Sequence, residues 1–193
     1  KKDPRIIKEY KKILFYKKKI KFVYQNKPLG TGDAILKTKK HIKDKFFLLL
    51  LPDDLIIKKN CSKSMISIHN RYKSSVMASM KVNKKTVSRW GIYKLGKKID
   101  KRNYLIKDVF EKPSIQNAPS NRAVIGRYIL PKNIFLKLSK QKPGKDGEIH
   151  ITDAIQSLIS DNNKFIAHNF SGKYLDCGSM KGYIKSSLDI SKI

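Results

Sequence analysis

Two adjacent carboxylates, Asp53 and Asp54, close the most apolar run of the sequence, FFLLLLP, which spans residues 46–52. An uninterrupted apolar run of this length is typical of a strand buried on both faces, as in a parallel sheet. Open α/β sheets bind ligands beyond the carboxyl ends of such strands. A carboxylate there could hold Mg²⁺, which prefers hard oxygen ligands together with substrate phosphates. Pro-Asp-Asp is also favourable turn chemistry, so a plain strand-end turn is the alternative.

Three further segments have residues that could contribute to a site. The turn LGTGD, residues 29–33, would let a planar base or a phosphate approach the backbone, because glycine has no side chain. Glu111 and Lys112 end a strand-like segment with opposite charges, and Asp176 lies in YLDCG, between a strand-like segment and the last helix. The alternative for the glycine turn is a simple strand-to-helix connection, and the alternative for Glu111, Lys112 and Asp176 is that they are exposed polar residues without a function. The four histidines have no mutual spacing that indicates a metal site or a triad, and we interpret them as structural or exposed.

The elements that must position these groups alternate between helical and strand-like patterns, which predicts an α/β fold around a mainly parallel sheet. Helices are expected over residues 5–17, after Gly32, and over 62–72, 133–140, 151–160 and 179–190, with Asn133 as an N-cap and Thr152 near another cap. Strands are expected over residues 19–25, 46–51, 75–82, 88–95, 103–112, 121–130 and 165–170. The segments 88–95 and 103–112 predict a small antiparallel extension.

The charge of the chain raises the question of nucleic-acid binding. The 193 residues fit one domain, and they include 44 Lys and Arg against 15 Asp and Glu, a formal net charge of +29. Only six of these basic residues are Arg, the residue suited to bidentate contacts with phosphates and guanines. The lysines are spread along the whole chain. A compositional bias with weak, salt-sensitive binding to polyanions is therefore favoured over a dedicated nucleic-acid surface.

Cysteine usage and hydropathy indicate a reducing compartment and no membrane span. Cys61 and Cys177 form no C-x-x-C pair, which argues against a disulfide framework or a zinc site. No apolar run approaches the roughly 20 residues that cross a bilayer. The chain begins with Lys1 rather than Met, so we expect a fragment or a processed product.

Taken in order, several segments resemble the bacterial UTP:glucose-1-phosphate uridylyltransferases, also called UDP-glucose pyrophosphorylases. The matching segments extend over nearly all of residues 22–183: FVYQNKPLGTGDAIL (22–36), LLPDDL (50–55), VSRWGI (87–92), VFEKP (109–113), APSNRAVIGRYILP (118–131), GEIHITDAI (147–155) and YLDCG (174–178). The APSN and GEIHITDAI segments are specific to this family among sugar nucleotidyltransferases. The glycine turn and the acids are shared more widely.

The resemblance implies a three-layer, Rossmann-like nucleotidyltransferase fold of the GT-A-like type, with a mainly parallel central sheet and a small antiparallel extension. It implies a reaction in which glucose 1-phosphate attacks the α-phosphorus of UTP, giving UDP-glucose and pyrophosphate. It also implies Mg²⁺ held by Asp53 and Asp176, with Asp54 beside Asp53 in the substrate site. Asp53 and Lys112 would be the catalytic residues.

The remaining site residues are carried over from the same resemblance. Gln25 and Gly30 match positions that contact uracil. Gly91, Glu111 and Lys112 match the glucose and phosphate site, where Glu111 accepts sugar hydroxyls and Lys112 pairs with the phosphate of glucose 1-phosphate. Gly126 lies in a strand whose backbone passes the sugar.

One departure from the family pattern affects the expected activity. Members begin with a strand and a Gly-rich loop with Arg and then Lys, which hold the triphosphate of UTP, and no such stretch precedes Phe22. We therefore expect a single nucleotidyltransferase domain over residues 1–193 that lacks this strand and loop. If these residues are the whole polypeptide, we expect poor stability and little or no turnover. Trp90 stands where Tyr is more usual, a change that an aromatic position should tolerate.

Two alternatives stay open. The first is a thymidylyltransferase acting on glucose 1-phosphate, against which the APSN segment at residues 118–121 argues. The second is an inactive basic nucleic-acid-binding or interaction protein that retains the fold, against which the scattered Lys and scarce Arg argue. The expected partners are UTP and glucose 1-phosphate, in a cytoplasmic homo-oligomer with no membrane and no specific nucleic acid.

Overall fold

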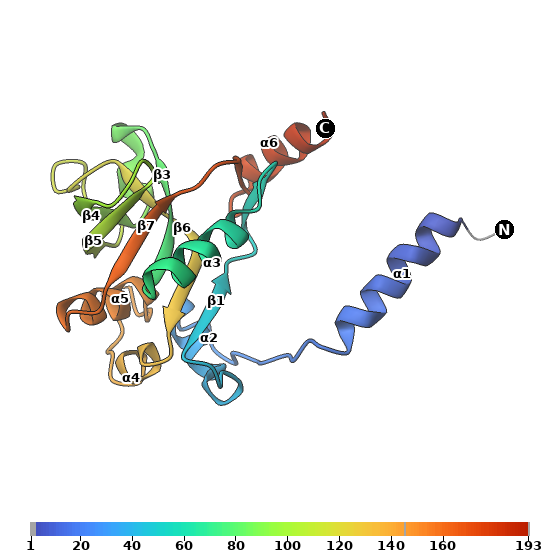
Figure 1. Cartoon of the computed structure of the whole chain (residues 1–193), viewed down its shortest axis with the longest axis horizontal. Coiled ribbons are helices and arrows are strands. Elements are labelled where there is room, and N and C mark those ends of the chain that lie inside the picture. Colours follow the sequence, from blue (N-terminus) through green and yellow to red (C-terminus); the bar gives the residue numbers. More distant parts are fainter. Residues whose placement is uncertain (1–2, 145, 193) are drawn as a thin grey trace.

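The computed structural model describes residues 3–144 and 146–192. Its strands are β1 Phe46–Leu50, β2 Asp54–Ile57, β3 Ser75–Lys81, β4 Ile92–Lys98, β5 Asn103–Phe110, β6 Arg122–Pro131, β7 Phe165–Asn169 and β8 Lys173–Asp176. Its helices are α1 Pro4–Lys17, α2 Thr31–Lys37, α3 Cys61–Tyr72, α4 Ile134–Leu138, α5 Ile151–Ser160 and α6 Met180–Ile190, with short 3-10 helices at Lys39–His41 and Lys84–Arg89. Six strands form one sheet in the order β1-β6-β3-β7-β5-β4, and β2 and β8 form a separate ribbon (Figure 1).

Helices cover both faces of the sheet, which confirms the predicted three-layer α/β architecture (Figure 1). On one face, Cys61 and Met65 of α3 pack against Val76 and Ile125 of the sheet. On the other face, α4 and α5 bury a larger apolar cluster. Strand β6 is buried on both faces, and its residues contribute to both apolar clusters. In α5 the buried apolar residues recur at helical spacing: Ile151, Ala154, Ile155 and Leu158.

The prediction of a mainly parallel sheet was wrong. Among the described residues only β3 and β7 pair in parallel, and the other neighbouring strands of the sheet pair antiparallel. Strands β1 and β3 do run in the same direction, as their connection through α3 predicts, but β6 inserts between them and runs the opposite way. The alternation of helices and strands along the sequence does not reveal such an insertion. The expected antiparallel extension is present as the β4–β5 hairpin.

The apolar strand β1 lies at the edge of the sheet, so the expectation that it is buried on both faces was also wrong. It pairs with β6 on one side and with no strand among the described residues on the other. Phe47 and Leu49 pack against the core, whereas Leu48 and Leu50 are 38% and 48% exposed. Hydropathy alone could not report this position, because it does not show how many neighbours a strand has.

Residues 19–25 were predicted as a strand, but Lys19 belongs to a turn after α1 and residues 20–25 have no regular secondary structure and no strand pairing. Phe22 and Tyr24 are 75% and 82% exposed. Alternating apolar side chains favour a strand, yet a strand forms only where a neighbour satisfies its backbone N–H and C=O groups. No such neighbour lies within the part of the chain that the structure describes.

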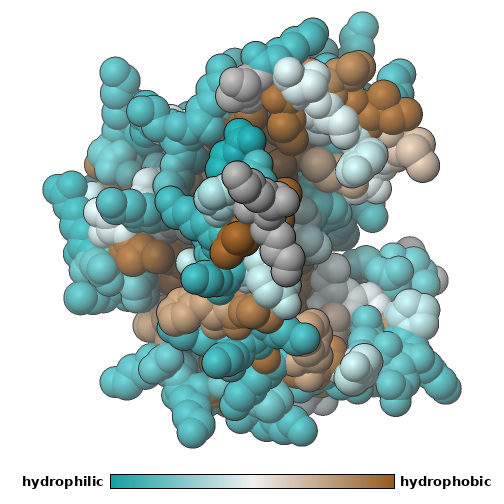
Figure 2. Space-filling model, turned by 90° about the vertical axis from the view of Figure 1, so that its right-hand side faces the viewer, coloured by the Kyte–Doolittle hydropathy of each residue, from teal (hydrophilic) through white to brown (hydrophobic). Residues whose placement is uncertain are grey.

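Helix α1 projects away from the sheet and buries none of its residues (Figure 1). Asp3 caps it by accepting a hydrogen bond from the Arg5 backbone N–H, and Pro4 suits its first turn. Ile6, Tyr10 and Ile13 are more than half exposed. Figure 2, a view from the side toward which α1 projects, shows brown apolar side chains among a largely teal surface. No helix within residues 3–144 and 146–192 is long and apolar enough to cross a membrane.

The other helices fall close to their predicted ranges, but two predicted caps behave differently. Asn133 occupies the N-cap of α4 without a capping hydrogen bond, and its side chain donates to Asn163 Oδ1 instead (3.3 Å). His150 is the N-cap of α5, so Thr152 lies inside the first turn. The strand predicted over residues 88–95 begins only at Ile92, because residues 84–89 form a 3-10 helix.

His168, in β7, is buried and hydrogen-bonded through both ring nitrogens. Nε2 lies 2.9 Å from Ser64 Oγ, and Nδ1 lies 2.9 Å from Asn103 Oδ1. The Asn103 amide donates to both oxygens of Asp100, so its own oxygen must accept from His168 Nδ1–H. Burial, and secondarily the charge of Arg102, lowers the pKa of His168 to about 4. This histidine therefore joins α3, β5 and β7 as a neutral structural group, in agreement with its interpretation from the sequence.

We predict that the free energy of unfolding falls as the pH decreases from about 6.5 to about 4. In the unfolded chain His168 has a pKa near 6.5, so the unfolded state binds the proton more readily across this window, and stability is fully present only above it. The loss at the acidic end should be roughly 3 kcal/mol. Denaturant titrations between pH 7 and pH 4 measure it.

The control for this prediction compares two histidine variants. His168→Asn should lose this part of the pH dependence, whereas His41→Asn, at an exposed position, should keep it. An unchanged pH dependence in His168→Asn would contradict the prediction.

Candidate functional site

The chain that follows β1 leads directly into a two-stranded ribbon on which the predicted acids lie. Pro52 and Asp53 form a turn, as one alternative from the sequence anticipated, but Asp54 already belongs to β2. Strand β2 pairs antiparallel with β8, and Asp54 lies opposite Asp176. The ribbon thus brings together two acidic segments that are far apart in the sequence.

Asp53 and Asp176 border the same turn, residues 177–179. The Cys177 backbone N–H donates to the carbonyl oxygen of Asp53 (2.8 Å). The Asp53 carboxylate passes over Gly178, where a Cβ atom would lie 2.7 Å from Asp53 Oδ2. The Asp176 carboxylate accepts hydrogen bonds from the Gly178 N–H (3.0 Å) and the Ser179 hydroxyl (3.2 Å). The structure therefore brings together the two residues that were predicted to share a metal ion.

Asp54 is bound by protein groups at both of its carboxylate oxygens. Oδ2 accepts from the Gly126 backbone N–H (2.6 Å), and Oδ1 accepts from the Tyr174 hydroxyl (2.5 Å). Burial raises the pKa of Asp54, although these two hydrogen bonds oppose the shift. Burial likewise raises the pKa of Tyr174, as does its bond to Asp54. Asp54 therefore links β2 to β6 and β8.

Gly126 allows strand β6 to pass closely over the acidic loop. Its carbonyl oxygen accepts from the Leu51 N–H and from Arg127 Nη1, both at 2.8 Å. Arg127 Nη1 also donates to the Leu51 carbonyl at 2.6 Å. A Cβ atom on Gly126 would lie 2.6 Å from both Asp54 Oδ2 and Leu51 Cβ, which is closer than such atoms can approach. The backbone at this point leaves no room for a side chain.

A cavity of about 210 Å³ lies beside this crossing and collects most of the predicted sugar-site residues. Its lining includes Asp54, Gly91, Glu111, Lys112 and Gly126. A second cavity, of about 400 Å³, is lined by Asp176, Ser179 and residues of α6. Arg89 borders both cavities, and its Nη2 lies 4.0 Å from Asp176 Oδ2.

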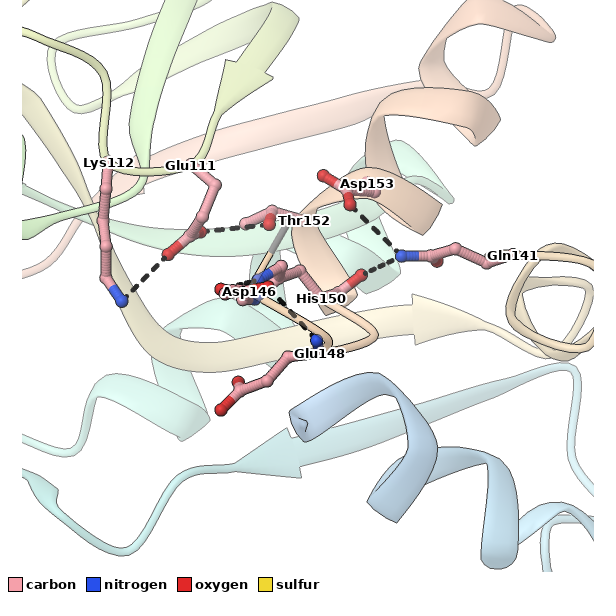
Figure 3. Close-up of polar contacts among 8 residues, drawn as sticks. All are labelled: Glu111, Lys112, Gln141, Asp146, Glu148, His150, Thr152 and Asp153. Carbon is pink, nitrogen blue, oxygen red and sulfur yellow. Dashed lines mark hydrogen bonds and ion pairs between the residues drawn. The ribbon is translucent and has the colours of Figure 1, made fainter. Parts of the chain in front are cut away.

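Glu111 and Lys112 follow the end of β5 and line this smaller cavity. Figure 3 shows their side chains with the polar contacts that they make. Glu111 Oε2 accepts a hydrogen bond from the Thr152 hydroxyl (3.0 Å), and Glu111 Oε1 lies 3.9 Å from Lys112 Nζ. Lys112 has a positive φ of 40°, and its N–H donates to the Trp90 carbonyl (3.1 Å). A left-handed conformation in a non-glycine residue has an energetic cost, so the fold must hold this turn firmly.

Gln25 and Gly30, predicted to contact a base, lie together at the glycine turn. Gln25 Nε2 donates to the Gly30 carbonyl (3.1 Å) and to Asp33 Oδ2 (2.9 Å). The hydrogen bond from Gln25 is the main reason that the pKa of Asp33 is lowered. The turn is held against residue 149 by backbone bonds from Ile149 to Leu29 and from Gly32 to Ile149. Thr31 of this turn also lines the smaller cavity.

A group of possible ligands at the rim of the smaller cavity was missed from the sequence. Asp146, Glu148 and His150 offer atoms within 4.8 Å of one another, and His150 Nε2 lies 2.8 Å from Asp146 Oδ2 (Figure 3). The D-x-E-x-H spacing could have indicated this cluster, because it places three possible metal ligands within five residues. The structure brings them together through a turn at Gly147, which has a positive φ of 79°. Glu148 and His150 line the cavity.

Four other residues were missed that support the predicted ones: Arg89, Arg127, Thr152 and Tyr174. Each acts on a residue distant in the sequence, so no local pattern indicates it. The sequence offered one indication for Arg89 and Arg127: arginine is rare in this Lys-rich chain, so each arginine could have been considered a candidate for a specific contact.

The fold and this arrangement define a class: a three-layer α/β protein with paired acids and a lysine beside a cavity, suited to binding phosphorylated ligands. A family model described as Nucleotidyl transferase matches residues 1–193. The chain belongs to the nucleotidyl transferase family.

Two curated relatives of the chain have the same activity in their names. The chain is 38% identical over 173 residues to UTP–glucose-1-phosphate uridylyltransferase 2 of Streptococcus pyogenes, covering 87% of the chain and 58% of the relative. It is 36% identical over 169 residues to the UTP–glucose-1-phosphate uridylyltransferase of Pseudomonas aeruginosa, covering 86% and 60%. The chain thus spans about three fifths of the length of these curated relatives.

Solved structures agree with this assignment. A UDP-glucose pyrophosphorylase complexed with UDP-glucose superposes with a TM-score of 0.83 at 41% identity, covering 89% of this chain and 66% of that one. A UTP-bound UGPase from Acinetobacter baumannii gives a TM-score of 0.73 at 32% identity, covering 85% and 57%. A glucose-1-phosphate thymidylyltransferase structure from Bacillus anthracis, at 20% identity and a TM-score of 0.69, shares the fold.

We predict that Gly126→Ala lowers the free energy of unfolding by roughly 1–3 kcal/mol, the usual cost of an atom forced into a packed site. The added Cβ would displace Leu51 or the Asp54 carboxylate. Urea denaturation of the two proteins measures the difference.

Gly96→Ala, also in a strand, is the matched control, because its Cβ would meet chiefly the flexible side chain of Lys107. Its stability should stay within about 0.5 kcal/mol of the parent. Equal stabilities of the two variants would contradict the steric role of Gly126.

Proposed function

We propose that this chain forms the nucleotide- and sugar-binding part of an enzyme that transfers the uridylyl group of UTP to glucose 1-phosphate, giving UDP-glucose and pyrophosphate. The observation that carries the proposal is the convergence of Asp53 and Asp176 on one turn, next to a cavity that exposes Glu111 and Lys112. The names of the relatives and of the solved structures support the choice of nucleotide and sugar.

The chemistry asks little covalent participation from the protein. An oxygen of the sugar phosphate forms a bond to the α-phosphorus of UTP, and the bond from that phosphorus to the bridging oxygen breaks, so that pyrophosphate leaves with the bonding electrons. The attacking oxygen is already anionic, and no side chain has to remove a proton. Positioning and charge neutralisation then account for most of the rate enhancement.

Asp53 and Asp176 fit a divalent cation, because carboxylate oxygens are the hard ligands that Mg²⁺ prefers. The two carboxylates meet at residues 177–179, where the missing side chain of Gly178 lets the Asp53 carboxylate lie close to the backbone. When bound, Mg²⁺ would neutralise phosphate charge and orient the phosphates. The protein contributes the fixed spacing of the two acids through the β2–β8 ribbon.

The remaining residues divide between the two substrates. Glu111 would accept sugar hydroxyls, Lys112 would pair with the phosphate of glucose 1-phosphate, and the backbones at Gly91 and Gly126 would allow the sugar to approach. Gln25 and Gly30 would contact uracil, with the Gln25 amide turning from Asp33 to the base. Because both oxygens of Asp54 are bound to protein groups, we assign it to positioning the loop rather than to direct substrate contact.

We also propose that the enzyme acts in the cytoplasm and forms a homo-oligomer. Light scattering tests the oligomeric state. A thymidylyltransferase would prefer dTTP to UTP, so a comparison of the two nucleotides separates the enzymes. A nucleic-acid-binding protein would hold nucleic acid above about 0.2 M salt, where weak non-specific binding collapses.

Asp53→Asn should abolish the Mg²⁺-dependent binding of UDP-glucose while leaving the fold intact, because the amide removes the negative charge that attracts the metal. Isothermal titration with and without Mg²⁺ measures the binding, and circular dichroism checks the fold. Asp44→Asn, at an exposed acid just before β1, is the control and should bind as the parent does. Undiminished binding by Asp53→Asn would remove Asp53 from the site.

Lys112→Ala should weaken the binding of glucose 1-phosphate roughly tenfold or more, the usual effect of losing a charged hydrogen bond, and should weaken UTP binding less. Titration calorimetry with each substrate measures both affinities. Lys107→Ala removes an exposed lysine of β5 and should leave both unchanged. A larger effect on UTP would contradict the assignment of Lys112.

A further inference from the structure

Thr152 uses its buried hydroxyl to hold Glu111 rather than to cap its own helix. It is the second residue of α5 and only 4% exposed. A threonine in a helix commonly donates to a backbone carbonyl one turn earlier. Here Oγ1 instead donates across the cavity wall to Glu111 Oε2, at 3.0 Å (Figure 3).

This bond leaves the two oxygens of Glu111 in different situations. Oε2 is held by Thr152 and lies 3.4 Å from the position that a Cβ on Gly91 would take. Oε1 is 3.9 Å from Lys112 Nζ, too far for a hydrogen bond, and so keeps its accepting capacity toward the cavity. A carboxylate fixed at one oxygen and free at the other has a defined direction in which it can accept a hydroxyl.

Helix α5 is a rigid support for this contact. Four of its apolar residues are buried in the core, as described above. One turn beyond Thr152, Gln156 Nε2 donates to Asp108 Oδ1 on β5 at 2.9 Å. Two side-chain hydrogen bonds of nearly equal length thus hold α5 against β5, and only the first touches a residue of the cavity that is proposed to bind sugar. The amino end of α5, where the helix dipole is positive, also favours the Glu111 carboxylate.

We propose that Thr152 is a positioning residue that directs the free oxygen of Glu111 toward the hydroxyls of the sugar, and thereby sets the selectivity for the sugar phosphate. The inference rests on the proposed function, since it assigns the sugar to this cavity. A site that hydrogen-bonds a substrate hydroxyl rejects analogues lacking it, because its buried polar group is then left unpaired. An unheld Glu111 would turn with its flexible side chain and lose part of this discrimination.

The test compares Thr152→Val, which keeps the shape and removes the hydroxyl, with Thr152→Ser, which keeps the hydroxyl. Titration calorimetry on the full chain measures the dissociation constants for glucose 1-phosphate, for a deoxyglucose 1-phosphate and for UTP. Thr152→Val should weaken glucose 1-phosphate binding roughly tenfold, as expected for a hydrogen bond to a charged group. Thr152→Val should also reduce the preference for glucose 1-phosphate over the deoxyglucose 1-phosphate, and it should leave UTP binding unchanged. Thr152→Ser should bind all three ligands as the parent does.

Gln156→Met is the matched control, because it breaks the second hydrogen bond between α5 and β5 away from Glu111. Both Gln156→Met and Thr152→Val should lower the free energy of unfolding, because each removes a side-chain hydrogen bond made by α5, but Gln156→Met should not change the sugar affinities. If Gln156→Met weakened glucose 1-phosphate binding as much as Thr152→Val does, the packing of α5 alone would explain the effect, and the inference would be overturned. Unchanged glucose 1-phosphate binding in Thr152→Val would also overturn it. Failure of the parent chain itself to bind glucose 1-phosphate would instead overturn the proposed function, and with it this role of Thr152.

Discussion

The close passage of β6 over the acidic loop at Gly126 is the constraint on which the site depends. At this point one residue without a side chain binds the Asp54 carboxylate through its N–H and Leu51 and Arg127 through its carbonyl. Asp54 in turn holds Tyr174 on β8. These hydrogen bonds help to place the ribbon that bears Asp53 and Asp176, and they are made where the backbone at Gly126 tolerates no Cβ atom.

The hydrogen bond from Gly126 to Asp54 also has an energetic role, because the Asp54 carboxylate is partly buried. A buried carboxylate is costly unless its oxygens are hydrogen-bonded, and burial does raise the pKa of Asp54. The N–H of Gly126 and the hydroxyl of Tyr174 offset that cost. The neighbouring acid Asp53 is left free of such bonds to side chains among the described residues, which leaves it able to serve as a ligand. Two adjacent acids of the same type thus have different surroundings, and we propose different roles for them.

The distribution of charge suits an anionic ligand. The chain has a formal net charge of +29, and several of its few acids, Asp53, Asp176 and Glu111, lie at or beside the two cavities with Arg89 and Lys112. The positive field would attract phosphorylated substrates at a distance, and the acids would give the site its capacity for a metal and for hydroxyl groups. The lysines elsewhere are scattered along the chain, so the positive potential surrounds the whole molecule. The choice of ligand would then depend on the residues at the cavities.

The sequence by itself determined the helices, most strands, the three-layer architecture and the family. Those depend on local periodicity and on short motifs such as LLPDDL and YLDCG, which a single chain displays directly. It also identified Glu111 and Lys112 as a pair and suggested that Asp53 and Asp176 meet. Only the tertiary structure decided that β6 runs between β1 and β3, that β1 lies at the edge, and that residues 19–25 lack a strand partner. It alone showed Asp54 bound between Gly126 and Tyr174, and Thr152 holding Glu111. The physical reason is the same in each case: strand neighbours and side-chain hydrogen bonds join residues far apart in the chain, and no local pattern records which partner a group will find.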